Sequence, residues 1–214
     1  MRRAVLFDVL GTLFTFEPLQ KKLRPAALEA WLGRLLHSAT SLTLAGRYAP
    51  FTDLAESTLR TTVAKLALKQ DAAAILATLS ELPPDPDADA AFDRLERAGL
   101  LIGVLTNGDE RLTRALLNSA GLEERVAEIV SVEEVELYKP HPATYRHAAE
   151  RLGVEPKRVT LIAAHAWDVV GAKEAGLDAV WIDRLEHEWP FPKGKPRRVA
   201  HDLLEAVELA IAKR

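Results

Sequence analysis

The sequence predicts an α/β fold: a Rossmann-like parallel sheet with helices on both faces, plus a small α-helical cap inserted after the first strand. Three observations predict it. Short apolar runs alternate with longer helical patterns along most of the 214 residues. Glycines follow the helical patterns at regular places. Between residues 15 and about 80 the alternation stops, and only helical patterns remain.

The strand candidates are apolar runs of four to six residues with polar residues at their ends. Such runs are typical of strands that a parallel sheet buries on both faces. The first run directly precedes an aspartate, and the others are spread over the second half of the chain. They span residues 4–7, 100–105, 128–132, 159–163 and 179–182.

Helical patterns separate these strands, and we expect helices over residues 88–98, 110–120, 143–152 and 169–175. A glycine follows each pattern and an apolar residue follows each glycine, which is the signature of a left-handed helix cap with its hydrophobic contact. The four glycines are Gly99, Gly121, Gly153 and Gly176. Repeated strand and helix in this order favours one βα-alternating domain.

The insertion contains helical patterns around residues 19–37, 53–67 and 71–79, and no convincing strand. Residues 82–87 then contain three prolines, which is typical of a linker. We therefore expect a core domain made of residues 1–14 and 83–214, and a cap domain made of residues 15–82. A cap inserted there would lie over the strand ends where α/β sheets bind ligands.

Composition narrows the class of protein. Hydrophobic residues make up 48% of the chain and charged residues 28%, with a net charge of −3, so we expect no nucleic-acid partner. The absence of cysteine excludes disulfides, thiolate catalysis and cysteine-bound metals. No uncharged apolar run approaches the roughly 18 residues of a transmembrane helix, so we expect no membrane partner and a cytoplasmic location.

Polar residues follow several predicted strands, and each has a plain structural explanation when taken alone. Asp8 follows the first strand, Thr106 and Asn107 the second, and Asp168 lies beyond the run at 159–163. Capping of the next helix would explain them, and a solvated loop would explain Lys139, which Pro140 and Pro142 follow. Together they place a nucleophilic carboxylate, a small polar cradle, a cation and a second carboxylate at one edge of the sheet.

The stretches that hold these residues resemble the motifs of the haloacid dehalogenase superfamily. Residues 7–13 resemble its nucleophile motif, and residues 105–108, 138–140 and 168–173 resemble its second, third and fourth motifs. The helical insertion is similar to the superfamily's α-helical cap. The resemblance covers the whole chain and implies a hydrolase in which Asp8 is the nucleophile.

Two positions distinguish branches of the superfamily. Its phosphatases use a general acid two positions after the nucleophile, where this chain has Leu10, and a magnesium-binding acid where it has Ala163. The sequence Ala-Trp-Asp at 166–168 and Tyr145 resemble the (S)-2-haloacid dehalogenase branch instead, which needs no metal. The resemblance therefore implies displacement of halide by Asp8 through an ester intermediate.

The same resemblance implies roles for further residues. Lys139 would keep Asp8 ionised, and Asp168 would orient Lys139 and help to activate the hydrolytic water. Residues expected to bind substrate or to position Asp8 are Thr12, Thr106, Asn107, Tyr145, Arg34 and His165.

The sequence departs from the branch in several places. The branch has tyrosine at the position of Leu10, and serine and asparagine at those of Ala163 and His165. Its cap arginine for the leaving halide aligns with Leu32, and Arg34 is the nearest arginine.

Two alternatives therefore stay open. One is a phosphatase with a degenerate magnesium site held by Asp8 and Asp168, and the other is a non-catalytic protein that kept the fold. In the enzyme interpretations the partner is a small carboxylate or phosphate substrate. Apolar cap residues could pack a homodimer or only the core of the cap; examples are Leu35, Leu36, Leu42 and Leu44.

Overall fold

The computed structural model describes residues 2–212 and contains a six-stranded, fully parallel sheet in the order β3-β2-β1-β4-β5-β6. The central strand β1 pairs with β2 on one side and β4 on the other, so that residues from three distant segments end at one edge of the sheet. The strands are β1 (Ala4–Asp8), β2 (Leu101–Thr106), β3 (Glu128–Ser131), β4 (Val159–Ala163), β5 (Asp178–Ile182) and β6 (Val199–Ala200).

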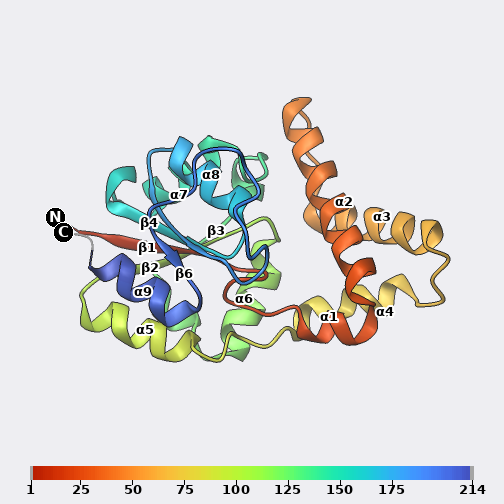
Figure 1. Ribbon diagram of the computed structural model, residues 1–214, viewed down its shortest axis with the longest axis horizontal. Coiled ribbons are helices and arrows are strands. Elements are labelled where there is room, and N and C mark those ends of the chain that lie inside the picture. Colours follow the sequence, from red (N-terminus) through yellow and green to blue (C-terminus); the bar gives the residue numbers. More distant parts are fainter. Residues whose placement is uncertain (1, 213–214) are drawn as a thin grey trace.

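Helices cover both faces of the sheet (Figure 1). On one face lie α5 (Ala88–Arg97), α6 (Glu110–Ser119) and α9 (Leu203–Ile211), and on the other α7 (Pro142–Arg151) and α8 (Ala166–Glu174). Side chains of β1 alternate between two apolar clusters, because Val5 and Phe7 pack on the first face and Leu6 on the second. The predicted fold class is confirmed. Short 3₁₀ helices complete the core at Glu123–Arg125, Val132–Glu134 and Pro156–Arg158.

The predicted strands and core helices are present, with ends shifted by a few residues. The four helix-ending glycines all have positive φ angles, as the capping pattern predicts. The sequence patterns did not predict β6 or α9. A two-residue strand is too short to show any period, so β6 left no signal in the sequence.

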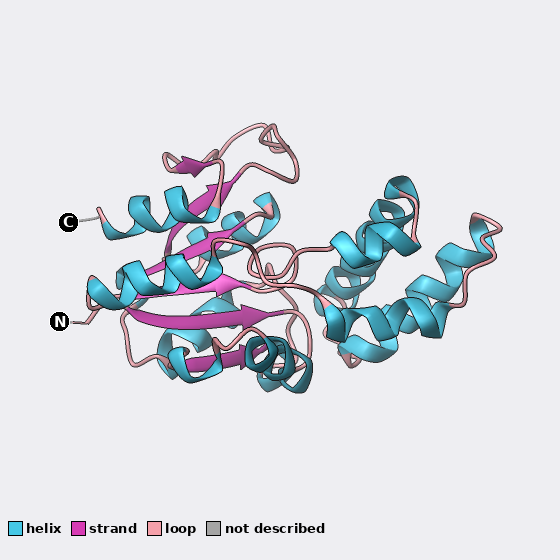
Figure 2. Ribbon diagram, turned by 90° about the horizontal axis from the view of Figure 1, so that it is seen from below, coloured by secondary structure: helices cyan, strands magenta, loops and turns pink. Residues whose placement is uncertain are grey.

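Residues 17–81 form the helical insertion, with α1 (Glu17–Lys22), α2 (Pro25–Leu44), α3 (Phe51–Lys65), α4 (Ala72–Leu76) and a 3₁₀ helix, η1 (Ala77–Glu81). The first predicted helix, 19–37, is two helices, because Pro25 holds Arg24 in an extended conformation and starts α2 at its own position. The helices of the insertion stand beyond the carboxyl ends of the strands (Figures 1 and 2).

Two chain segments connect the insertion to the sheet and run side by side. The Asp85 backbone N–H donates to Leu13 O at 2.7 Å, and the Thr15 N–H donates to Pro83 O at 3.0 Å. We propose the boundary between core and cap at this pair of segments, which agrees with the expected division near residues 14 and 83.

The apolar side chains of the cap differ in exposure. Leu35 in the middle of α2 is buried, whereas Leu44, the last residue of α2, is 83% exposed. Within residues 2–212, no helix combines the length and the apolar character that crossing a membrane requires.

Candidate active site

Asp8 is the last residue of β1 and is held by the turn that follows. Its Oδ2 accepts a hydrogen bond from the Thr12 hydroxyl at 2.7 Å, and the same hydroxyl oxygen accepts from the Ala164 N–H at 2.9 Å. Gly11 has φ +88°, and a Cβ atom there would lie 2.8 Å from Nε2 of His165. Glycine is therefore required both by the backbone conformation and by the close approach of the histidine ring.

Lys139 links the two carboxylates. Its Nζ donates to Asp8 Oδ1 at 2.7 Å, to Asp168 Oδ2 at 2.8 Å and to the Leu105 carbonyl at 3.1 Å. An ammonium group has three N–H donors, so each has an acceptor. The Lys139 and Asp168 side chains are fully buried and that of Asp8 is 5% exposed.

The charges of this cluster shift the pKa values of its members. Burial opposes ionisation of Asp8, but the charges of Lys139 and His165 and the hydrogen bonds from Lys139 and Thr12 outweigh it and lower the pKa of Asp8. Burial also opposes the charged form of Lys139, yet the two carboxylates hold its pKa above the ordinary value. Burial and the charge of Asp8 raise the pKa of Asp168. Of these two carboxylates, Asp8 is therefore the one whose ionised form the surroundings favour.

Asp168 lies in the first turn of α8, where His165, not Asp168, is the N-cap residue. The Asp168 side chain turns into the core and accepts a hydrogen bond from the Tyr145 hydroxyl at 2.5 Å. Gly171 makes room for this contact, because a Cβ atom there would lie 2.6 Å from both the Tyr145 hydroxyl and the Pro140 carbonyl.

Tyr145, expected to bind substrate, is therefore placed differently. It is fully buried, it is not among the residues that line the cavity described below, and its hydroxyl orients Asp168. Thr12 is likewise buried and contacts Asp8 rather than the cavity.

Residues at and just after the ends of β2 and β4 supply polar groups around Asp8. Asn107 Oδ1 accepts from the Lys139 N–H at 2.9 Å, which leaves its Nδ2 hydrogens as donors. Thr106 Oγ1 accepts from the Gly108 N–H, and Asp109 caps α6. His165 Nε2 lies 3.0 Å from the Leu10 carbonyl and 3.8 Å from Asp8 Oδ2.

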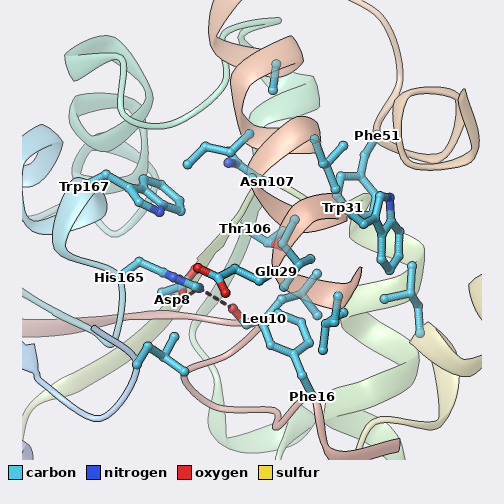
Figure 3. A pocket seen from close by; sticks show the side chains of 18 of the residues that line it. Asp8, Leu10, Phe16, Glu29, Trp31, Phe51, Thr106, Asn107, His165 and Trp167 are labelled. Atoms are coloured by element: carbon cyan, nitrogen blue, oxygen red, sulfur yellow. Dashed lines mark hydrogen bonds and ion pairs between the residues drawn. The ribbon is translucent and has the colours of Figure 1, made fainter. Parts of the chain in front are cut away.

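A cavity of about 560 Å³ lies over Asp8, between the sheet and the helical insertion. Figure 3 shows side chains from both parts of the chain meeting around it. The core supplies the polar residues Asp8, Thr106, Asn107 and His165, together with apolar ones such as Leu10 and Trp167. The other side of the cavity is mainly apolar and comes from α2, with Leu28, Trp31, Leu32, Leu35, Leu36 and Ala39.

Arg34 is not brought to the cavity. Its Nε donates to the Thr62 hydroxyl of α3 at 3.3 Å, and it is not among the lining residues. Helix geometry explains this, because positions 28, 31, 32 and 35 share one side of α2, whereas position 34 is turned toward α3. Arg34 therefore belongs to the packing of α2 against α3.

Arg184 positions the nucleophile turn and was overlooked by sequence reasoning. Its Nη2 donates to the carbonyls of Gly11 and Thr12 at 2.9 and 2.6 Å, and its Nη1 pairs with Asp85. Arg184 lies in the irregular segment after β5, and no local pattern marks it. Glu29 of α2 and Glu186, which follows β5, also line the cavity, and no local pattern marks either of them.

A magnesium ion, which the phosphatase alternative requires, does not fit this donor set. Asp8 and Asp168 already share one cation, Lys139, and their other oxygens accept from the Thr12 and Tyr145 hydroxyls. Within the described part of the chain, no three His, Asp or Glu side chains gather as metal ligands. Mg²⁺ prefers several oxygen ligands in octahedral geometry, which this arrangement does not supply.

Comparison with known proteins defines the class of protein. The model of the haloacid dehalogenase-like hydrolase family matches residues 2–176, so the chain belongs to this family of hydrolases. It is similar to (S)-2-haloacid dehalogenase 1 of Pseudomonas sp. (strain CBS-3), with 30% identity over 98% of this chain and 96% of the relative. It is also similar to the (S)-2-haloacid dehalogenase of Xanthobacter autotrophicus, with 32% identity over 88% of this chain and 78% of the relative.

Solved structures agree with these relatives. The L-2-haloacid dehalogenase RSc1362 superposes with a TM-score of 0.92 at 28% identity and covers 99% of both chains. The L-2-haloacid dehalogenase of Xanthobacter autotrophicus with chloropropionic acid covalently bound superposes with a TM-score of 0.86 at 26% identity and covers 100% of both chains. The predicted resemblance to the (S)-2-haloacid dehalogenase branch is confirmed.

Proposed function

We propose that this protein is an (S)-2-haloacid dehalogenase that works through an ester on Asp8. The Asp8 carboxylate attacks C2 of the haloacid, a carbon–oxygen bond forms, and the halide leaves with the electron pair of the carbon–halogen bond. Attack from the side opposite the halogen inverts the configuration at C2.

A water molecule then hydrolyses the ester. Its oxygen joins Cγ of Asp8, the bond between Cγ and the substrate oxygen breaks, and the products are the 2-hydroxy acid and a regenerated Asp8 carboxylate. One proton is released, so that each turnover consumes one water and yields one halide and one proton.

The observation on which the proposal rests is the Asp8 carboxylate at the floor of the cavity, held between the Lys139 ammonium and the Thr12 hydroxyl. Lys139 lowers the pKa of the nucleophile and Asp168 holds Lys139 in place, so Asp168 acts through the lysine. We propose the Nδ2 hydrogens of Asn107, a residue that lines the cavity, as donors to the substrate carboxylate. The similarity to a dehalogenase with covalently bound chloropropionic acid supports the same chemistry.

Halide release from the two enantiomers of 2-chloropropionate, measured with EDTA present, tests the proposal. We expect release from the (S) enantiomer alone, undiminished by EDTA, since we propose that no metal takes part. Asp8→Asn removes the nucleophile and should abolish release, whereas Asp53→Asn on the exposed side of α3 should not change it. Full activity of Asp8→Asn would contradict the assignment.

A further inference from the structure

The wall of the cavity opposite Asp8 is apolar over several turns of helix. The side chains of α2 that line it recur three or four positions apart, and Phe51 of α3 and Leu79 of η1 extend the same wall. Several are only partly buried, among them Leu32 and Leu36. Apolar surface of this kind is stabilised when an apolar ligand group displaces water from it.

The cavity is large for a three-carbon acid. Its 560 Å³ lies in the range of sites that enclose ligands of drug-like size. With Asp8 bonded to C2 and the carboxylate at Asn107, a methyl substituent would leave most of the apolar wall in contact with water. A longer substituent on C2 would cover it.

The charged groups restrict the ligand further. Among the described residues that line the cavity, the acidic side chains are Asp8, Glu29 and Glu186, His165 is the one basic side chain, and no lysine or arginine takes part. Figure 3 shows Glu29 reaching from α2 into the cavity, toward Asp8 and His165. A second negative charge on the substrate would meet Glu29, so the cavity favours a monoanion.

We propose that the preferred substrates are 2-haloalkanoic monocarboxylic acids whose C2 substituent is apolar and larger than methyl, such as a butyl chain or a benzyl group. The substituent lies along the α2 wall, and Glu29 selects against dianions. This inference rests on the proposed dehalogenase function and names its substrate class.

Halide release from a series of (S)-2-bromo acids tests it. Each buried methylene is worth roughly a fourfold gain, so kcat/KM for 2-bromohexanoate should exceed that for 2-bromopropionate by at least about tenfold. The dianion 2-bromosuccinate should fall below 2-bromopropionate, and Glu29→Gln should narrow that gap severalfold.

A variant that fills the cavity gives a second readout. Gly33 lines the cavity within α2, its φ is not positive, and a Cβ atom there would meet nothing within 4 Å, so a larger side chain fits the helix. Gly33→Phe should lower kcat/KM for 2-bromohexanoate by about tenfold or more and that for 2-bromopropionate by less than about threefold. The control Ser41→Phe adds a phenyl ring at an exposed position of α2 that does not line the cavity, and it should change neither value.

The outcomes separate the two proposals. Turnover of 2-bromopropionate with no gain from longer substituents, or an equal effect of Gly33→Phe on both acids, would overturn the substrate class and leave the dehalogenase function standing. Efficient turnover of 2-bromosuccinate by the wild type would overturn the selection by Glu29. Absence of halide release from every acid would overturn the dehalogenase function itself, and the substrate class with it.

Discussion

Replacing Lys139 by methionine isolates the contribution of its charge, because methionine keeps a similar length and apolar stem. In the wild type the ammonium lies 2.7 Å from Asp8 and 2.8 Å from Asp168, with all three side chains buried. Removal of one partner of a buried ion pair costs about 3–5 kcal/mol. We expect a loss of that size in the free energy of unfolding at pH 8.

The loss should depend on pH in a defined direction. The pKa of Asp8 is lowered in the fold, so its contribution is present above the ordinary value of 3.8 and is lost only as the pH falls through the folded pKa. The pKa of Lys139 is raised, so its contribution is present below 10.5 and is lost as the pH rises through the folded pKa. The wild type keeps both contributions at pH 5 and at pH 8.

In Lys139→Met, burial and mutual repulsion raise the pKa values of the two carboxylates, which then bind a proton on mild acidification. The difference in stability between wild type and variant should therefore shrink from pH 8 to pH 5. Urea unfolding followed by tryptophan fluorescence measures it at both values.

The control Lys21→Met removes an exposed lysine whose Nζ lies 2.8 Å from the Glu17 carboxylate, the same distance as between Lys139 and Asp168. It should leave the free energy of unfolding within error of the wild type. A loss below about 1 kcal/mol for Lys139→Met at pH 8, or one that grows on acidification, would refute the electrostatic reasoning.

Three further variants test the groups that position the site. Tyr145→Phe leaves a buried oxygen of Asp168 without its donor, so unfolding should need about 1–3 kcal/mol less and kcat should fall while KM changes little. Gly171→Ala places a methyl group 2.6 Å from the Tyr145 hydroxyl, so its kcat should fall below that of Tyr145→Phe, and an unchanged kcat would contradict the close packing. Arg184→Gln weakens the charged bonds to the nucleophile turn and should cost about 1.5–3 kcal/mol of stability together with a lower kcat; thermal unfolding and halide release measure both.

Sequence patterns predicted the sheet and the cluster of charges well, for a physical reason. Strands buried on both faces must be apolar, so a carboxylate at the end of one, such as Asp8, is easily recognised as a departure from the apolar pattern. Because parallel strands end at one edge, residues after β1 and β4 lie close together whatever their separation along the chain.

Contacts that depend on side-chain direction or on distant segments could not be predicted in this way. Arg34 stands between two cavity-lining residues in the sequence, Gly33 and Leu35, yet the helix turns its side chain toward Thr62. Tyr145 lies beneath the site and contacts Asp168, which a motif position does not reveal. Arg184 reaches the nucleophile turn from a segment about 170 residues away, with no pattern to connect the two.

A single turnover in H₂¹⁸O, with enzyme in excess over (S)-2-chloropropionate, tests most directly whether Asp8 forms the ester. Hydrolysis at Cγ of Asp8 should place ¹⁸O in the Asp8 carboxylate, seen by mass spectrometry of the peptide, and leave the lactate hydroxyl unlabelled. Label in the lactate hydroxyl with an unlabelled Asp8 peptide would mean that water attacks the substrate directly, and would contradict the account.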